Sequence, residues 1–151
     1  GKEAMQYVIK DSTQGICPDG WHIPSDEEWE ELAQYISNDN GGYSKFEGND
    51  DGLIDDWNEV GGHLKSTSGW NSGGNGTDDY DFEALPGGIL FLADVIDRVG
   101  NVGRFWSSTK SHDGNSYTRK MNNSSSNLYR KNDVGYDYDG YGLSVRCIKD
   151  E

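Results

Sequence analysis

The amino-acid sequence predicts one loop-rich domain of mixed α and β structure, with an all-β domain as the alternative. The chain has 151 residues, the size of one ordinary domain. Its 21 glycines and its 32% of hydrophobic residues are untypical of a helical bundle, which is rich in Ala, Leu, Glu and Lys. Five Trp, nine Tyr and four Phe supply the large apolar side chains that a small core needs.

The clearest local signal is the start of a helix. Ser25 and Glu28 form the pattern of a capping box. Three acidic residues follow Ser25, in the first turn, where the helix dipole favours negative charge. Apolar residues then recur at helical spacing, at Trp29, Leu32, Ala33 and Ile36. The helix is expected to end near Ser37.

A second helix is expected over residues 52–60. Its apolar residues share one face, which continues past its end: Leu53, Trp57, Val60 and Leu64. Gly61 and Gly62 are expected to stop the regular helix. Residues 66–88 are rich in Gly, Ser, Asn and Asp, which predicts long loops. Four large side chains are expected to anchor those loops: Trp70, Tyr80, Phe82 and Leu85.

Short runs of β-favouring residues predict the strands. Strands are expected at residues 5–9, 89–95, 105–109 and 143–147. The last has Leu143, Val145 and Cys147 on one face, because side chains alternate along a strand. Tyr117, Arg119 and Met121 alternate with more polar residues, as in a strand. A hairpin is therefore expected, with strands at residues 117–122 and 127–130 and a turn at 122–126.

The charge of the chain disfavours nucleic acid as a partner. The net charge is −14, and a surface rich in carboxylates repels phosphate backbones. No apolar run is long enough for a transmembrane helix, so no membrane insertion is expected. Residues 1–103 carry 21 acids and five bases, whereas residues 110–131 carry five bases and one acid. This shift predicts a locally basic surface on an acidic protein.

The two cysteines, Cys17 and Cys147, stand near opposite ends of the chain. A disulfide between them closes a loop of roughly 130 residues and stabilises the fold through the unfolded state. Two buried thiols are the alternative. Two cysteines are too few to establish an oxidising compartment.

Catalytic and metal-binding patterns are weak. His22, His63 and His112 are far apart, so a zinc site has no support. The sequence has no nucleophile elbow, phosphate-binding loop or dinucleotide fingerprint. The acidic clusters at residues 49–56 and 78–81 offer oxygen ligands for calcium, but neither has EF-hand spacing. Because such clusters are usually solvated or cap helices, no cofactor is expected and calcium stays the alternative.

Residues 107–142 have a distinct composition. Of these 36 residues, 25 are Asn, Ser, Asp, Tyr or Gly. Tyr gives contact area with few rotors to order, and the small polar residues give adaptable hydrogen bonds, as in antibody paratopes. A solvated loop with strand-forming tyrosines has the same composition, so both interpretations stay open at this point.

Five motifs in order resemble the Fibrobacter succinogenes major paralogous domain. The first is residues 17–29, Cys-Pro-Asp-Gly-Trp-His-Ile-Pro-Ser-Asp-Glu-Glu-Trp. The others are residues 64–70 with 76–78, 82–88, 103–109 and 142–150. The resemblance extends from about residue 15 to residue 150. Residues 88–103 depart from it, because they are more apolar than the family pattern, and they are expected to pack inward or to form a partner contact.

The family is similar to C-type-lectin-fold proteins, which include the formylglycine-generating enzyme and the variable proteins of diversity-generating retroelements. The resemblance implies an α+β, C-type lectin fold with two helices, small antiparallel sheets, long loops and paired N- and C-terminal strands. It also brings Cys17 and Cys147 into one region. The enzyme uses a cysteine pair in its active site, and cysteines at the chain ends argue against that chemistry. The Glu-Pro-Asn and Gln-Pro-Asp motifs of calcium-dependent lectins are absent.

The retroelement proteins are diversified at adenines, often in codons that yield Asn, Tyr, Asp, Ser and Gly. The resemblance therefore implies that residues 1–151 form one non-enzymatic, ligand-binding domain with a variable surface in residues 107–142. Its partner is expected to be a protein or glycan on another cell or particle, which places the domain outside the cell or on a cell or virion surface. The alternative is a carbohydrate-binding or adhesive module of fixed specificity.

The candidate ligand-binding residues are tyrosines of that segment, which are expected to give contact area, and polar residues, which are expected to give specificity. They are Lys110, His112, Asn115, Tyr117, Lys120, Asn122, Asn123, Asn127, Tyr129, Lys131, Asn132, Tyr136, Asp137, Tyr138, Asp139 and Tyr141.

Overall fold

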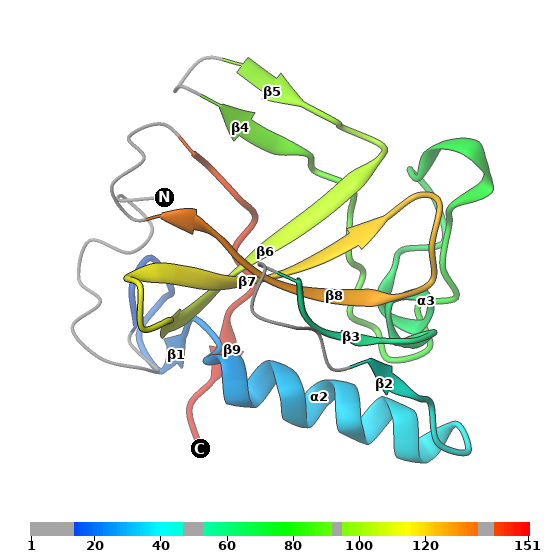
Figure 1. The fold of residues 1–151 in the computed structure, drawn as a ribbon, viewed down its shortest axis with the longest axis horizontal. Coiled ribbons are helices and arrows are strands. Elements are labelled where there is room, and N and C mark those ends of the chain that lie inside the picture. Colours follow the sequence, from blue (N-terminus) through cyan, green and yellow to red (C-terminus); the bar gives the residue numbers. More distant parts are fainter. Residues whose placement is uncertain (1–13, 47–52, 92–94, 136–140) are drawn as a thin grey trace.

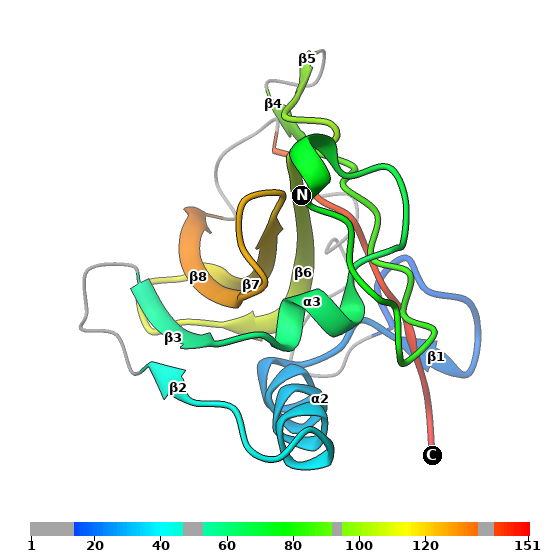
Figure 2. The ribbon, with the colours of Figure 1, turned by 90° about the vertical axis from the view of Figure 1, so that its right-hand side faces the viewer.

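The computed structural model describes residues 14–46, 53–91, 95–135 and 141–151. In these residues the largest sheet is antiparallel, with the strand order β2–β3–β8–β7–β6. Its strands are β2 (Lys45–Phe46), β3 (Leu53–Trp57), β6 (Val102–Lys110), β7 (Asn115–Asn122) and β8 (Leu128–Gly135). Helix α2 (Asp26–Asp39) lies along one face of this sheet (Figures 1 and 2). The α+β class is therefore confirmed.

Two small antiparallel sheets accompany the large one. The first pairs β1 (Trp21–His22) with β9 (Ile148–Lys149), close to the C-terminus. The second is a hairpin of β4 (Ile89–Phe91) and β5 (Val95–Asp97), where a single strand over 89–95 was expected. This hairpin projects from the end of the molecule opposite α2 (Figure 1). Its β5 side chains are exposed, so this segment does not pack inward as a whole. The strand expected at residues 5–9 lies outside the described residues.

Helix α2 forms where the capping pattern predicts it. The Ser25 hydroxyl accepts a hydrogen bond from the Glu28 backbone N–H at 3.1 Å, and the Glu28 carboxylate accepts one from the Ser25 N–H at 2.8 Å. The helix runs to Asp39, two residues beyond the predicted end. Ser37 is buried inside its last turn, and its hydroxyl accepts the N–H of Tyr43, so the chain turns back only after Asn40.

The second predicted helix is wrong in position. Residues 53–57 form strand β3 beside β8, and the short helix α3 (Val60–Leu64) follows. Gly61 and Gly62 lie inside α3 and do not stop it. Trp57, Val60 and Leu64 are all buried in one core, which is why they resemble a single helical stripe in the sequence. A short 3-10 turn follows at Asn71–Gly73, within the predicted loop region.

Gly61 is required by a close approach of α3 to the turn between β7 and β8. A Cβ at Gly61 would lie 2.4 Å from the carbonyl oxygen of Asn127, whereas one at Gly62 would lie 3.3 Å from the Ser126 side chain. We expect Gly61→Ala to reduce the free energy of unfolding by about 1–3 kcal/mol through overpacking.

Gly62→Ala is the matched control. It gains about 1 kcal/mol of helix propensity, and the nearest atoms to its Cβ belong to the Ser126 side chain at 3.3 and 3.6 Å, so its effect is expected to be neutral or stabilising. Chemical denaturation of the two variants checks this. Equal stability of the two would show that the close approach is not tight.

The main core joins α2 and α3 to one face of the large sheet. It contains Trp29, Ala33, Ile36, Trp57, Val60, Leu64, Trp70, Ala84, Phe105, Met121 and Leu128. The Trp29 ring lies 5.6 Å from that of Phe82 and 6.0 Å from that of Phe105. Trp70, Tyr80 and Phe82 anchor their loop to this core as predicted, but Leu85 is 55% exposed and does not.

A second cluster closes the domain near its ends. Cys17, Ile23 and Trp106 are buried together, and Leu143, Val145 and Cys147 pack against them from one face as predicted. Cys17 and Cys147 form a disulfide. The regular strand expected over 143–147 is wrong, because the segment leaves β6 after Ser144 and joins β1 only at Ile148. In the described residues no helix has the length and apolar character to cross a membrane.

Candidate functional site

The structure separates the predicted ligand-binding residues into several groups. Lys110, His112 and Asn115 lie around the turn between β6 and β7, where Lys110 and His112 are exposed. Asn122, Asn123 and Asn127 lie around the turn at the other end of β7. Tyr141 lies against Phe91, with ring centres 5.0 Å apart, and packs on the second cluster. Tyr136, Asp137, Tyr138 and Asp139 lie outside the described residues.

The remaining candidates lie on β7 and β8. Tyr117 points to the α2 side of the sheet, where the Arg130 guanidinium stacks 4.1 Å from its ring centre. Lys120, Tyr129 and Lys131 lie on the opposite side, and Asn132 follows them half-buried. The segment is not exposed throughout, because Ser107, Ser108, Ser111, Ser116, Thr118, Arg119 and Met121 are buried.

The predicted basic surface is only partly correct, because two of its five bases point inward. The Arg119 side chain is 2% exposed and donates a hydrogen bond to Asp26 Oδ1 at 2.6 Å. Arg130 donates to both oxygens of the same carboxylate, at 3.0 and 2.5 Å. Burying a guanidinium requires a paired anion, and Asp26 in the first turn of α2 provides it. Charge counts alone do not reveal this pairing, since Asp26 and Arg119 are 93 residues apart.

Three of the predicted residues do form a surface, here called the sheet face: Lys120, Tyr129 and Lys131. Lys120 and Tyr129 are cross-strand partners, and Lys131 pairs with the buried Thr118. The Lys131 ammonium lies 5.8 Å from the centre of the Tyr129 ring. The Tyr129 hydroxyl donates to the Ser125 hydroxyl at 2.9 Å, which orients the ring. An ordered aromatic ring beside an ammonium group suits ligands that combine apolar surface with carboxylate or hydroxyl acceptors.

The turn between β7 and β8 borders a polar pocket of about 380 Å³. The pocket is lined by Lys65, residues 72–75 and residues 123–126, so it includes the predicted Asn123. Lys65 is 3% exposed, and its ammonium donates to the carbonyls of Asn122 at 3.1 Å and Ser125 at 3.0 Å. The same ammonium lies 5.0 Å from the Trp70 ring centre. Burial lowers the pKa of Lys65.

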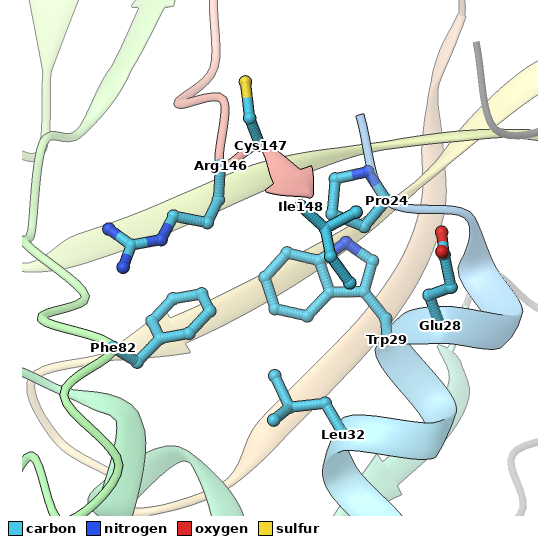
Figure 3. Close-up of a pocket in the computed structure, with 8 residues that line it drawn as sticks. All are labelled: Pro24, Glu28, Trp29, Leu32, Phe82, Arg146, Cys147 and Ile148. Carbon is cyan, nitrogen blue, oxygen red and sulfur yellow. The ribbon is translucent and has the colours of Figure 1, made fainter. Parts of the chain in front are cut away.

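A second pocket, of about 250 Å³, is apolar and was not predicted (Figure 3). It lies between α2 and the C-terminal segment, with Trp29, Leu32, Phe82 and Ile148 among its lining residues. Except for Leu32, each lining residue belongs to one of the five motifs, but no spacing in the sequence shows that these segments converge. Arg146 and Glu28 are its charged members.

His22 joins the C-terminal segment to the start of α2. Its Nδ1 lies 2.6 Å from Asp150 Oδ1, and its Nε2 lies 2.8 Å from Glu28 Oε1. Burial lowers the pKa of His22, but the hydrogen bonds and charges of Asp150 and Glu28 outweigh burial and hold the pKa above 6.5. The protonated ring therefore bridges two carboxylates.

This bridge predicts a pH-dependent contribution to stability. Because the folded-state pKa is raised, the stabilisation by His22 is fully present below pH 6.5 and is lost as the pH rises through the folded-state pKa. We expect His22→Gln to destabilise the protein more at pH 6 than at pH 8.5. Urea denaturation of both proteins at the two pH values measures the difference. A difference that is independent of pH, or larger at pH 8.5, would contradict the bridge.

His63 forms a separate hydrogen-bonded chain with Tyr43 and Asp79. Tyr43 Oη lies 2.7 Å from His63 Nε2, and His63 Nδ1 lies 2.5 Å from Asp79 Oδ2. Hydrogen bonds from Thr77 and then from His63 lower the pKa of Asp79. The chain ties the loop around residue 79 to the end of α2, because Tyr43 also binds Ser37.

The acidic residues proposed as calcium ligands do not converge where they can be placed. Asp79 binds His63 and Thr77, and Asp78 accepts the N–H of Glu83 at 2.7 Å. In the described ranges, no group of three His, Cys, Asp or Glu residues gathers as a metal site would. Residues 49–52 of the other acidic cluster lie outside those ranges.

Comparisons with known proteins give one match. The model of a protein family described as the Fibrobacter succinogenes major domain matches residues 4–149. No curated protein and no solved structure matches the chain.

Proposed function

Since the chain belongs to the Fibrobacter succinogenes major domain family, we propose that it is a non-enzymatic ligand-binding module. In this proposal a C-type lectin fold displays a replaceable polar and aromatic surface on the hairpin of β7 and β8. The module is the diversified target protein of a diversity-generating retroelement. It acts outside the cell or on a cell or virion surface, and its partner is a protein or glycan on another cell or particle. The Cys17–Cys147 disulfide supports an oxidising location.

The way in which the hairpin is held carries the proposal. Lys65 binds the main-chain carbonyls of Asn122 and Ser125. Gly61 and Gly74 lie so close to the backbone of Asn127 and Asn123 that a Cβ would come within 2.4 Å of it. Every residue has these main-chain atoms, so such contacts tolerate a change of side chain. The sheet face next to this turn is accordingly the part of residues 107–142 that we assign to ligand binding.

A displayed library tests whether the sheet face is replaceable. Lys120, Tyr129 and Lys131 are randomised together, and a control library randomises the buried Thr118, Met121 and Leu128 on the same two strands. Most members of the first library are expected to stay folded, with changes below about 1 kcal/mol, or roughly 2–4 °C in Tm. Members of the control library are expected to unfold.

Selection of both libraries against one fixed target protein, such as lysozyme, tests binding. Binders with substitutions at the sheet face support the proposal. A sheet-face library that unfolds like the control, or that yields no binder better than the starting protein, contradicts it. The retroelement is tested separately in the flanking DNA, where an imperfect copy of the β7–β8 coding sequence should differ mainly at adenines. A flanking region without such a copy would contradict this part of the proposal.

The polar pocket favours a second candidate function, a glycan-binding module of fixed specificity. Its Ser, Asn and Gly lining and the buried Lys65 provide closely spaced donors and acceptors of the kind that sugar hydroxyls need. Binding of the wild-type protein to one class of glycan on an array, abolished by Asn123→Ala, would favour this candidate over a variable surface.

A further inference from the structure

The apolar pocket in Figure 3 has a floor suited to an apolar ring. The Trp29 indole lies at its centre, with Phe82 and Leu32 beside it and Ile148 above. Trp29 is 1% exposed, so its position is set by the core beneath. The pocket volume is about 250 Å³. Since a cavity of about 150 Å³ accepts benzene, this pocket has room for an aromatic ring with a short chain.

Arg146 provides a cation at one end of this pocket. Its guanidinium lies 4.8 Å from the centre of the Phe82 ring, which holds it in place by stacking. In the part of the chain that the structure describes, Arg146 makes no ion pair and no hydrogen bond. The chain has 27 acidic and 13 basic residues, so a guanidinium without a carboxylate partner is unexpected. Its planar fork matches a carboxylate through two parallel hydrogen bonds.

Glu28 makes the two ends of the pocket electrostatically different. Figure 3 shows Glu28 and Arg146 on opposite sides of the Trp29 ring. Both Glu28 oxygens are already used, because Oε1 contacts His22 Nε2 and Oε2 accepts the Ser25 N–H. These two contacts hold the Glu28 carboxylate in place, and its negative charge disfavours an anion at that end.

We propose that this pocket binds a small carboxylate that carries an aromatic or branched aliphatic group. The apolar group lies between Leu32, Phe82 and Ile148, above the buried Trp29, and the carboxylate pairs with Arg146 at the end away from Glu28. Water leaves the apolar walls when the ring enters, and the guanidinium gains an ion pair that none of the described residues gives it. The site is separate from the sheet face, so a test of this proposal can succeed or fail independently of the function proposed above.

The probe that tests this proposal is 3-phenylpropionate, and 3-phenylpropan-1-ol is its uncharged match. Each is titrated into the whole protein to about 20 mM, well above the millimolar dissociation constant expected for so small a ligand. The NMR signal of the Trp29 indole N–H is followed, and that of Trp57 serves as an internal control. We expect the carboxylate to shift the Trp29 signal at lower concentration than the alcohol does.

Two variants locate the carboxylate. Arg146→Gln is expected to weaken 3-phenylpropionate about tenfold and to leave the alcohol unchanged, because a charge-assisted hydrogen bond is lost. Lys149→Gln removes the same charge from an exposed residue that does not line the pocket, and it is expected to bind like the wild type. The proposal is overturned if the Trp29 signal does not move, if the alcohol binds wild type as tightly as the carboxylate, or if both variants weaken binding equally. The comparison of the two probes uses only the wild-type protein, so it does not depend on whether either variant folds.

Discussion

Replacing both Cys17 and Cys147 with Ala is expected to lower the free energy of unfolding by up to about 5 kcal/mol. The disulfide links residues 130 positions apart, and a loop of that length loses much of its freedom in the unfolded state. The two side chains also help to fill the second cluster with Ile23 and Trp106, so their truncation adds a packing loss. An effect this large is comparable with the whole stability of many single domains.

Urea denaturation with and without dithiothreitol measures this loss. The reductant should destabilise the wild-type protein by a similar amount and leave the double variant unchanged. If the variant stayed within about 1 kcal/mol of the oxidised wild type, the unfolded chain would have to be compact enough already to gain nothing from the link.

Asp26→Ala is expected to destabilise the protein by about 3–5 kcal/mol, because it leaves the buried Arg119 without its main counter-ion. Arg119 and Arg130 both donate to this carboxylate, whose side chain is 15% exposed. The nearest other anion for Arg119 is Glu30, at 3.9 Å, and Glu30 already pairs with Lys45. Burial lowers the pKa of Arg119, and the charge of Asp26 opposes that effect.

Two control variants separate this effect from the helix dipole and from simple loss of an ion pair. Glu27→Gln removes an exposed charge from the same helix turn and is expected to cost only about 0.3–1 kcal/mol. Arg119→Met removes the buried guanidinium itself and leaves Asp26 paired with Arg130, so it is expected to be close to neutral. Equal losses of stability for Asp26→Ala and Glu27→Gln in thermal unfolding would show that the Arg119 guanidinium does not depend on Asp26 as its counter-ion.

Local patterns predicted those elements whose signal lies within a few residues. The capping box at Ser25 placed the start of α2, and the alternation of Tyr117, Arg119 and Met121 placed strand β7. The same alternation put the three side chains on one face, but it did not show that this face is the α2 side. Arg119 lies on the α2 side because Asp26 pairs with it there, and only the folded chain brings these two residues together.

The failures have the same physical origin. Trp57, Val60 and Leu64 share a buried face because a strand and a short helix both point into one core, and a helical stripe has the same spacing. Helix propensity alone predicts that Gly61 and Gly62 end a helix. In the structure Gly61 lies inside α3, because the Asn127 backbone approaches the helix too closely for any larger residue. Similarly, composition alone identified residues 107–142 as a polar aromatic segment, and only the register of β7 and β8 shows that Lys120, Tyr129 and Lys131 share a face.

The position of the disulfide also determines how the domain responds to a pulling force. The Cα atoms of Cys17 and Cys147 are 5.9 Å apart, beside the pairing of β1 with β9. Tension applied to the chain before Cys17 and after Cys147 passes through the covalent S–S bond. Residues 18–146 therefore carry almost none of the load. They contain the sheet face, the polar pocket and all of the apolar pocket except Cys147 and Ile148. We therefore expect the oxidised protein to keep these surfaces folded under a tension that unfolds the reduced protein.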